Sequence, residues 1–464
     1  MELRIDRQAM VPVVQQIVDE LAGWIRQNGL PPATRLPSVR HIARNNLLSQ
    51  SSVVEACERL VAQGILASRH GSGFFVATSA PELKGASDLP WLEGAAVADC
   101  SDVPPTQLRL GCGGLPESWR ETDDLSYAIR QVTRTDMAGL FNYSTPLGLP
   151  TLRQQILKRL KLLSISVDES RILTTAGATQ GLDLIVRTLL KSGDCVVVES
   201  PGFAHLFDLL RLHGIRMLEV PRTPHGPDTE VLERLLVENS PRALFINSFH
   251  QNPTGSSLTL AVAQRVLQLS NAHRMLVIED DVYADLHNPP GTRLAALDDA
   301  RVIYVGSFSK TLSSSLRVGF VVAGAEVVSR LAEVKMISSM GASRFCESVL
   351  ASLLASGAYR KLVQRQRQRL NTDRAAALQI LEDAGWQVFG KPAGGLFIWA
   401  RSRVCDYAQV QIQARRFGIL LSSATAFSPG GEAGNWLRIN VAYACDPRAR
   451  GFFQATASDR PPAS

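Results

Sequence analysis

The fold of the longer part of this chain is indicated by residues 302–310, which read VIYVGSFSK. The β-branched and aromatic residues at the start of this stretch are typical of a buried strand, and Lys310 follows shortly after it. Comparable apolar runs, separated by helical patterns, occur at 195–199, 243–247, 275–279 and 318–323. This alternation predicts an α/β fold with a mostly parallel sheet that helices cover on both faces. Lys310 is therefore expected where such sheets bind ligands, at the carboxyl end of a strand.

A second motif predicts a helix N-terminus that can bind phosphate. Gly177, Ala178 and Thr179 precede a predicted helix. The backbone N–H groups at the start of a helix have no intrahelical partner and bind phosphate well. Arg317, which follows Lys310 closely, can add a charge-assisted hydrogen bond to the same phosphate. Together these residues predict a phosphate cup.

Residues that follow other predicted strands complete a cofactor site. Asp280 can keep a pyridine nitrogen protonated, so that the ring acts as an electron sink. Tyr283 and Asn252 can both bond a phenolic oxygen on that ring, and Phe203 can stack on its face. Lys310 is an amine that can form a Schiff base. This set matches a cofactor made of an aldehyde, a phosphate and a protonatable pyridine, which is pyridoxal 5′-phosphate (PLP).

Each of these residues also has an ordinary structural explanation. A lysine after a strand is usually on the surface, Phe203 alone is more often part of the core, and Asp281 is interpreted as structural. The agreement of all the motifs, in one order along the chain, favours cofactor binding over that alternative.

From about residue 108 to 446 the chain resembles the fold-type I aminotransferases of the aspartate aminotransferase kind. The resemblance implies a large domain with a mostly parallel sheet, a smaller C-terminal subdomain and a homodimer. It makes Lys310 the residue that holds PLP, and Asp280 the partner of the ring nitrogen. The implied phosphate contacts are Thr179, Ser307 and Arg317. Tyr143 would reach the phosphate bound by the partner subunit, and Arg438 would hold the α-carboxylate of a ligand.

The first part of the chain predicts a smaller, separate domain. Helical periodicity begins near Pro12, and Ser38 and Ser49 are placed to cap two further helices. A predicted hairpin at 65–77 carries a basic, glycine-rich tip. Short helices followed by such a wing form a winged helix-turn-helix, which places its last helix in the major groove of double-stranded DNA.

This N-terminal part resembles the GntR family of regulators. The motifs that carry the resemblance include RLPSVR at 35–40, SQSSV at 49–53 and HGSG at 70–73. The residues that it implies face DNA are Arg40, Gln50, Ser51, Ser52, His70 and Gly71. The family usually has Arg where this chain has Gln50, which puts guanine recognition there in doubt. The alternative is that these polar residues only solvate the outer face of a small helical domain.

Composition and charge agree with a globular protein of at least two domains. The chain has 464 residues, of which 45% are hydrophobic and 20% charged, and its formal net charge of +6 is only a mild hint of a polyanionic partner. We see no apolar core of a signal peptide, no apolar run long enough to span a membrane, and no metal-ligand spacing among the seven cysteines. We therefore expect a reduced cytoplasmic protein without a bound metal.

The predicted organisation is a DNA-binding domain at 1–78, a linker at 79–106, an aminotransferase-like PLP-binding domain at 107–450 and a tail at 451–464. This combination resembles the MocR subfamily of GntR regulators, in which the aminotransferase fold senses an effector. The resemblance implies a transcription regulator that binds a small amine or amino acid, without sustained enzymatic turnover. Two alternatives stay open: an active aminotransferase that also binds DNA, and a regulator for which PLP itself is the signal.

Overall fold

The computed structural model describes residues 3, 5, 12–28, 30–69, 72–77, 107–119, 122–286, 291, 293–431 and 434–457. The chain forms two compact units, one within 1–92 and the other within 93–464. The predicted linker at 79–106 lies outside the described residues. Among the described segments, no helix has both the length and the apolar character that crossing a membrane requires.

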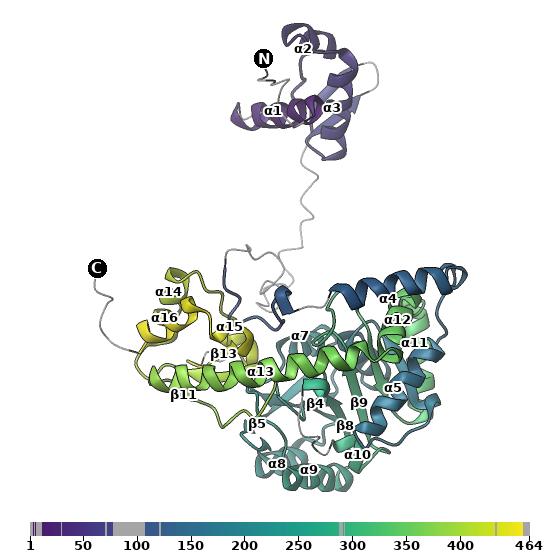
Figure 1. Cartoon of the computed structure of the whole chain (residues 1–464), viewed down its shortest axis with the longest axis vertical. Coiled ribbons are helices and arrows are strands. Elements are labelled where there is room, and N and C mark those ends of the chain that lie inside the picture. The colour runs from purple at the N-terminus through teal and green to yellow at the C-terminus, as the bar shows by residue number, and fades with distance from the viewer. Residues whose placement is uncertain are drawn as a thin grey trace. The chain divides into compact units, whose positions relative to one another are not determined.

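The N-terminal unit packs helices against a β-hairpin (Figure 1). Its elements are α1 (Val13–Gln27), α2 (Val39–Asn45), α3 (Gln50–Ala62), β1 (Leu66–Arg69) and β2 (Gly73–Val76). Ser38 and Ser49 accept hydrogen bonds from the backbone N–H groups of His41 and Ser52, so each caps its helix as predicted. The buried core includes Ile17, Leu21, Ile42, Val53, Leu60 and Leu66. The predicted winged helix-turn-helix is confirmed.

Within the second unit, the described residues form a sheet of eight strands in the order β3-β10-β9-β8-β7-β4-β5-β6. The strands are β3 (Ile172–Thr175), β4 (Cys195–Ser200), β5 (Arg216–Thr223), β6 (Gly226–Pro227), β7 (Ala243–Ile246), β8 (Leu276–Asp280), β9 (Val302–Ser307) and β10 (Gly319–Val322). Strands β5, β4, β7, β8 and β9 are parallel, whereas β10 is antiparallel to both neighbours and β6 to β5. The predicted mostly parallel sheet is confirmed.

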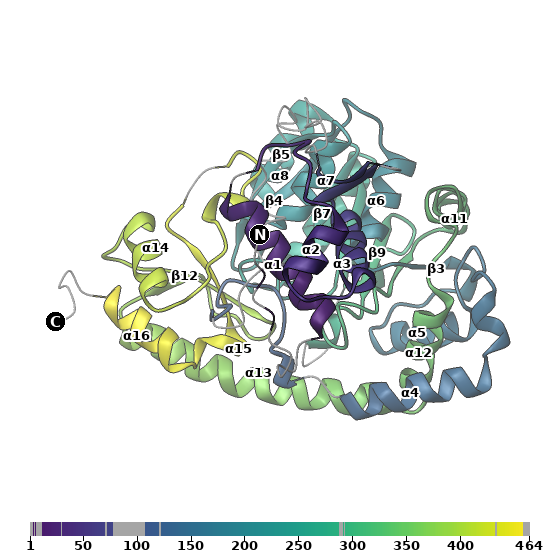
Figure 2. The same cartoon turned by 90° about the horizontal axis from the view of Figure 1, so that it is seen from above.

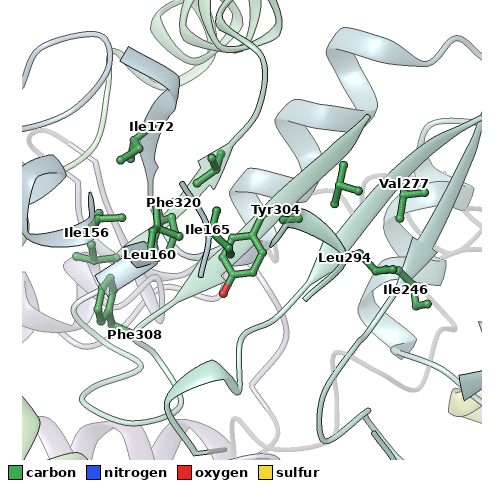
Figure 3. Close-up of a cluster of buried hydrophobic side chains, with 14 of the residues drawn as sticks. Ile156, Leu160, Ile165, Ile172, Ile246, Val277, Leu294, Tyr304, Phe308 and Phe320 are labelled. Atoms are coloured by element: carbon green, nitrogen blue, oxygen red, sulfur yellow. The ribbon is translucent and has the colours of Figure 1, made fainter. Parts of the chain in front are cut away.

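Helices cover both faces of this sheet. They are α4 (Thr122–Thr135), α5 (Pro150–Leu162), α6 (Ala178–Leu189), α7 (Ala204–Leu212), α8 (Thr229–Asn239), α9 (Leu260–Ala272), α10 (Leu294–Leu297), α11 (Ala325–Ser339), α12 (Arg344–Ala355) and α13 (Ala358–Asp383). Val197 and Tyr304 belong to a core cluster with α5 and α12, part of which Figure 3 shows. Val198 and Phe245 belong to a second cluster with α6, α7 and α11. Strands buried on both faces need continuous apolar sequences, which is the pattern that predicted them.

A smaller antiparallel sheet with its own helices forms the C-terminal subdomain. Its elements are β11 (Gln387–Val388), β12 (Phe397–Arg401), β13 (Leu437–Asn440), α14 (Tyr407–Arg416), α15 (Val441–Ala444) and α16 (Pro447–Ala455). Short 3-10 helices lie at Glu117–Trp119 (η2), Ala138–Phe141 (η3), Glu169–Arg171 (η4), Ala284–Leu286 (η5) and Ala424–Phe427 (η6). The long helix α13 connects the large sheet to this subdomain, where it packs on α15 and α16 (Figures 1 and 2).

The subdomain extends beyond the predicted boundary at residue 450. Helix α16 runs to Ala455, and Phe452 and Phe453 are fully buried beside Trp386. Burying two aromatic side chains stabilises the end of the domain, since each removes a large apolar area from water. Residues 451–457 therefore belong to the subdomain rather than to a tail.

Candidate functional site

A cavity of about 480 Å³ lies at the carboxyl ends of β7, β8 and β9. The predicted cofactor and ligand residues that line it are Ala178, Thr179, Phe203, Asn252, Asp280, Tyr283, Ser307, Lys310, Arg317 and Arg438. Tyr143 does not line this cavity, and its side chain is 73% exposed in the single chain. We call this space the cofactor cavity, because its shape and chemistry are tested against PLP below.

Lys310 lies in the loop that follows β9. Its Nζ donates a hydrogen bond to the backbone oxygen of Gly113, at 3.1 Å. A Cβ atom on Gly113 would lie 3.4 Å from that Nζ, so the lysine passes in van der Waals range of this glycine. The amine is therefore held at the wall of the cavity by a segment far away in the sequence.

The start of α6 and the Arg317 side chain form a cradle of positive potential. Gly177 precedes α6 with a φ of 84°, a left-handed conformation that favours glycine, and a Cβ there would come 2.5 Å from the Arg317 guanidinium. Arg317 Nη2 donates to the backbone oxygen of Ala176, at 3.1 Å. Ser307 Oγ accepts from the backbone N–H of Ser309, at 3.2 Å. The cradle fits a phosphate group, because a helix start and a guanidinium both stabilise an anion.

Asp280 supplies a buried carboxylate with an unused acceptor. Its Oδ1 is buried and has no hydrogen-bond partner among the described residues. Asn247 Nδ2 donates to the backbone oxygen of Asp280, at 2.6 Å, which fixes the end of β8. Burial raises the pKa of Asp280 from 3.8 to about 7, because the charged form loses its hydration. A pyridinium N–H would satisfy this oxygen, so the carboxylate fits the ring nitrogen of PLP.

The residues predicted beside the ring are arranged as donors and an aromatic face. Tyr283 is buried, and burial raises the pKa of its phenol, so the hydroxyl stays protonated at neutral pH. Asn252 Oδ1 accepts from Arg438 Nη1 at 2.9 Å, which leaves the amide nitrogen of Asn252 as the donor. Phe203 stacks on His205 with ring centroids 5.4 Å apart and planes within 8°.

Arg438 is held from several directions at once. Its Nε and Nη2 donate to the backbone oxygen of Gly111, at 3.0 and 2.7 Å, and Nη2 also donates to Ser422 Oγ, at 2.9 Å. The guanidinium lies 4.8 Å from the ring centroids of both Phe397 and Phe427. A guanidinium fixed in this way presents a planar, permanently charged group, which suits a carboxylate ligand.

The predicted DNA-facing residues that are described lie at the surface of the N-terminal unit. Arg40 in α2 and Gln50 at the first position of α3 are exposed. Ser51 Oγ and Ser52 Oγ lie 2.9 and 2.7 Å from the Oγ of the capping residue Ser49. These two serines therefore have a local structural contact in addition to their place at the surface. His70 and Gly71 lie outside the described residues.

Comparison with known families agrees with this geometry. Residues 105–448 match the model of the class I and II aminotransferases. The chain belongs to the class I and II aminotransferase family. Residues 13–76 match the model of bacterial regulatory proteins of the gntR family. The predicted MocR-like architecture, a GntR-type domain followed by an aminotransferase domain, is confirmed.

Relatives of both kinds are similar to this aminotransferase-family chain. A Bacillus subtilis (strain 168) protein named uncharacterized HTH-type transcriptional regulator YdfD is 28% identical over 456 residues, which cover 94% of this chain and 93% of that one. The 2-aminoadipate transaminase of Thermus thermophilus is 31% identical over 296 residues, covering 62% and 73%. The crystal structure of LysN, an α-aminoadipate aminotransferase from Thermus thermophilus complexed with N-(5′-phosphopyridoxyl)-L-leucine, has a TM-score of 0.71 and 26% identity, covering 79% and 98%.

Sequence reasoning missed several residues of the aminotransferase-type cavity. Asn247 directly follows β7, so its position after an apolar run was a usable signal. Gly113, which accepts from Lys310, lies in a segment without strand or helix periodicity and gave no signal. The ring of His205 could be placed only by the structure, because it lies inside the first turn of α7.

Proposed function

We propose that this chain is a PLP-dependent transcription regulator, which binds DNA through its N-terminal unit and an amine or amino acid effector in the cofactor cavity. The observation that carries the proposal is the unpartnered Oδ1 of Asp280 in the cavity that contains Lys310 and the cradle at α6. An unpaired buried acceptor is costly, so it is expected where a ligand completes it. Because the same chain contains a helix-turn-helix, binding of that ligand would be able to change the binding of DNA.

PLP would be held by this chain's residues in the following way. Lys310 would bond the aldehyde covalently, Asp280 would accept from the ring nitrogen, and Arg317 with the start of α6 would hold the phosphate. The donors Tyr283 and Asn252 would bond the phenolic oxygen. When bound, PLP supplies an electrophilic carbon that captures amines and a ring that accepts electrons.

The effector is proposed to be an amine that carries a carboxylate. Arg438 lines the cofactor cavity, and its guanidinium is fixed by Gly111 and Ser422 before any ligand arrives. A preorganised cation binds a carboxylate without a large ordering cost. An effector that makes contacts in only one domain arrangement would shift the population of arrangements, and with it the affinity for DNA.

A homodimer is part of the proposal, because Tyr143 is exposed and would contact PLP bound in the partner subunit. The loop that carries Tyr143 is fastened to α12: Glu347, which is fully buried, accepts from Ser144 Oγ, from Thr174 Oγ1 and from the backbone N–H of Leu149. A rigid loop that holds an aromatic residue in solvent is expected at an interface between subunits.

An active aminotransferase that also binds DNA is the second candidate. It is favoured by the complete set of cofactor-cavity residues and by the similarity to the 2-aminoadipate transaminase and LysN, whose names describe amino acid chemistry. The full-length similarity to proteins named HTH-type transcriptional regulators supports the regulator instead. A regulator that responds to PLP alone is a third outcome.

One experiment separates these functions. The full-length protein is incubated with PLP, and its visible absorbance is recorded before and after borohydride reduction. Binding to a promoter fragment from the neighbouring genes is then measured with PLP alone, with PLP and each amino acid, and with a keto acid acceptor added. A change in DNA affinity that requires an amino acid supports the regulator. Sustained keto acid conversion supports the enzyme, and a folded protein that stays colourless with PLP would falsify the cofactor assignment.

A further inference from the structure

A second cavity, of about 990 Å³, lies between α5 and the N-terminal half of α13. None of its lining residues lines the cofactor cavity. Its charged lining residues are Lys158, Arg159, Asp285, Arg293, Arg360 and Arg367. Five of these six side chains are cationic, and we call this space the basic cavity.

The positive charge of the basic cavity is only partly compensated. Asp285 forms an ion pair with Arg159 and accepts a hydrogen bond from the Tyr359 hydroxyl, and its backbone oxygen accepts from Arg367 Nε. Lys158 and Arg360 are exposed and form no ion pair with any residue that the structure describes. One carboxylate at the cavity therefore faces several cations.

Arg293 gives an independent observation that points to an anion. Its side chain is fully buried and pairs with Asp281 through Nε, at 2.8 Å, yet its Nη2 has no hydrogen-bond partner among the described residues. Burial and the positive charges of Arg159 and Arg293 lower the pKa of Arg367. The three guanidiniums thus lie close enough to repel one another, which a bound anion would relieve.

We propose that the basic cavity binds a small phosphate-bearing anion and that its occupancy is transmitted to Lys310. Guanidinium groups bond phosphate oxygens in pairs, and a cluster of them favours an anion with more than one charge. The volume is in the range of small-molecule sites. A phosphorylated metabolite or an inorganic polyphosphate has this chemistry, whereas the buried Arg293 lies too deep for the backbone of a DNA duplex.

A chain of hydrogen bonds connects the basic cavity to the loop that carries Lys310. Tyr359 donates to Asp285, so the Tyr359 hydroxyl oxygen accepts from Thr311 Oγ1, at 2.6 Å. Thr311 follows Lys310 directly and lines the cofactor cavity. The Arg159 guanidinium also lies 5.4 Å from the ring centroid of Phe308, on the same loop. Figure 3 shows Phe308 beside Leu160 and Ile156 of α5, so this loop and α5 are packed together.

An anion in the basic cavity would compete with Asp285 for Arg159 and Arg367. Asp285 would then be left with Tyr359 as its main partner, which changes the hydrogen bond that Tyr359 accepts from Thr311. The position of Lys310 in the cofactor cavity would shift with Thr311. This second half of the inference rests on the proposed binding of PLP, whereas anion binding itself does not.

The binding test uses the full-length, PLP-loaded protein, in which the phosphate cradle at α6 is already filled. Inorganic pyrophosphate is titrated into it calorimetrically. We expect one site per chain and a Kd that rises about tenfold or more in the Lys158→Ala/Arg360→Ala variant. The matched control is Lys161→Ala/Lys361→Ala, which removes the same charge from exposed positions of the same two helices outside the cavity. Its Kd should stay within about twofold of the wild type.

Two results would overturn anion binding at this site. One is an equal loss of affinity in both double variants, which would mean that pyrophosphate responds only to net charge. The other is no pyrophosphate binding at millimolar concentration while a random-sequence DNA duplex loses affinity only in Lys158→Ala/Arg360→Ala. The basic cavity would then be a contact for the DNA backbone rather than a small-molecule site.

The coupling test follows the visible absorbance of bound PLP while pyrophosphate is added. We expect a shift of the band in the wild type and none in Tyr359→Phe, which keeps the ring that packs on Phe308 at 5.6 Å but lacks the hydroxyl. Pyrophosphate should still bind this variant, because Arg159, Arg293 and Arg367 are kept. The connection between the basic cavity and Lys310 would be refuted if pyrophosphate shifted the PLP band in Tyr359→Phe as well. It would also be refuted if pyrophosphate did not shift the band in the wild type. If PLP itself does not bind, the same calorimetric comparison of the two double variants on the PLP-free protein still decides whether the anion site exists.

Discussion

The surface that is proposed to face DNA and the cofactor cavity hold their polar residues in opposite ways. Gln50 and Ser51 are exposed, and the Oγ of Ser51 lies within hydrogen-bond distance of the Oγ of the nearby capping residue Ser49. In the cofactor cavity, by contrast, Arg438 donates to Gly111 from 327 residues away, and the Oδ1 atom of Asp280 is buried. The residues proposed to face DNA therefore depend little on contacts with the rest of the fold. The residues of the cofactor cavity are held by contacts with distant segments of the chain. Substitutions should therefore change recognition alone at the surface, and recognition together with stability in the cavity.

The largest expected effect is that of Lys310→Ala. The variant should lose all borohydride-fixable PLP, because no other lysine lines the cofactor cavity among the described residues. The fold should persist, since the side chain is only half-buried. Mass spectrometry after reduction measures the adduct, and Lys361→Ala on the surface of α13 is the control. A PLP adduct of normal yield in Lys310→Ala would remove Lys310 from its proposed role.

Arg438→Ala should weaken the binding of a carboxylate effector by about 2 to 5 kcal/mol, the usual cost of removing one partner of a buried charge pair. It should also change the PLP spectrum slightly, because Arg438 Nη1 holds the oxygen of Asn252. Titration of the amino acid that alters DNA affinity measures the first effect.

Arg401→Ala provides the comparison for that variant. Arg401 lies on β12 in the same small sheet and bonds Gln387, but it does not line the cofactor cavity. Its effector affinity should equal that of the wild type. Equal affinities for Arg438→Ala and Arg401→Ala would mean that the carboxylate is bound elsewhere.

Asp280→Asn and Asp281→Asn test whether two adjacent buried carboxylates have separate tasks. Asp280→Asn should lower PLP affinity by about 1.5 to 3 kcal/mol, the range for a hydrogen bond to a charged group. Asp281 pairs with Arg293 and accepts from the Tyr304 hydroxyl at 3.0 Å, away from the cofactor cavity. Its substitution should lower the free energy of unfolding and leave PLP affinity nearly unchanged. PLP titration and urea unfolding of both variants measure this, and a reversed pattern would exchange the two assignments.

The same burial predicts how the PLP-free protein responds to pH. Burial raises the pKa of Asp280 and of Glu279 to about 7, from 3.8 and 4.5. Between about pH 4 and 7 the unfolded state has released protons that the folded state keeps, so the free energy of unfolding falls as pH rises. Each carboxyl group that keeps its proton only in the folded state lowers the free energy of unfolding by at most about 1.4 kcal/mol per pH unit. Urea unfolding at pH 5.5 and 7.5 measures this change. The free energy of unfolding should fall less between these two pH values in Asp280→Asn than in the wild type. An equal fall in both proteins would contradict the raised pKa of Asp280.

The sequence predicted those parts of the site that follow strands or begin helices. Lys310, Asp280 and Thr179 occupy such positions, where local pattern and chemistry coincide. The partners of Arg438 and the basic cavity were not predictable, because they depend on which faces of distant segments meet. Helical periodicity in α5 and α13 shows that each helix has a buried side, but not that Arg159 and Arg367 both contact Asp285, one at its carboxylate and the other at its backbone oxygen. The buried end of α16 was missed for the same reason.

The smallest expected effect concerns the surface. Gln50 is exposed at the first position of α3, so its amide can pair with adenine through N6 and N7 if this helix start enters the major groove. An arginine would instead favour O6 and N7 of guanine. Gln50→Arg should therefore shift the preferred base at one position of each half-site from adenine to guanine, with a discrimination of roughly 1 to 3 kcal/mol.

Selection of binding sites from random DNA measures that preference for the wild type and for Gln50→Arg. Gln63→Arg, at the exposed opposite end of α3, adds the same charge and should tighten binding without changing the selected sequence. Stability should be equal in all three proteins, because the Ser49 cap and the core below it are untouched. If Gln50→Arg selects the same sequence as the wild type, Gln50 does not read a base. The exposed polar face of α3 would then serve only to solvate the domain, which is the alternative that its local hydrogen bonds allow.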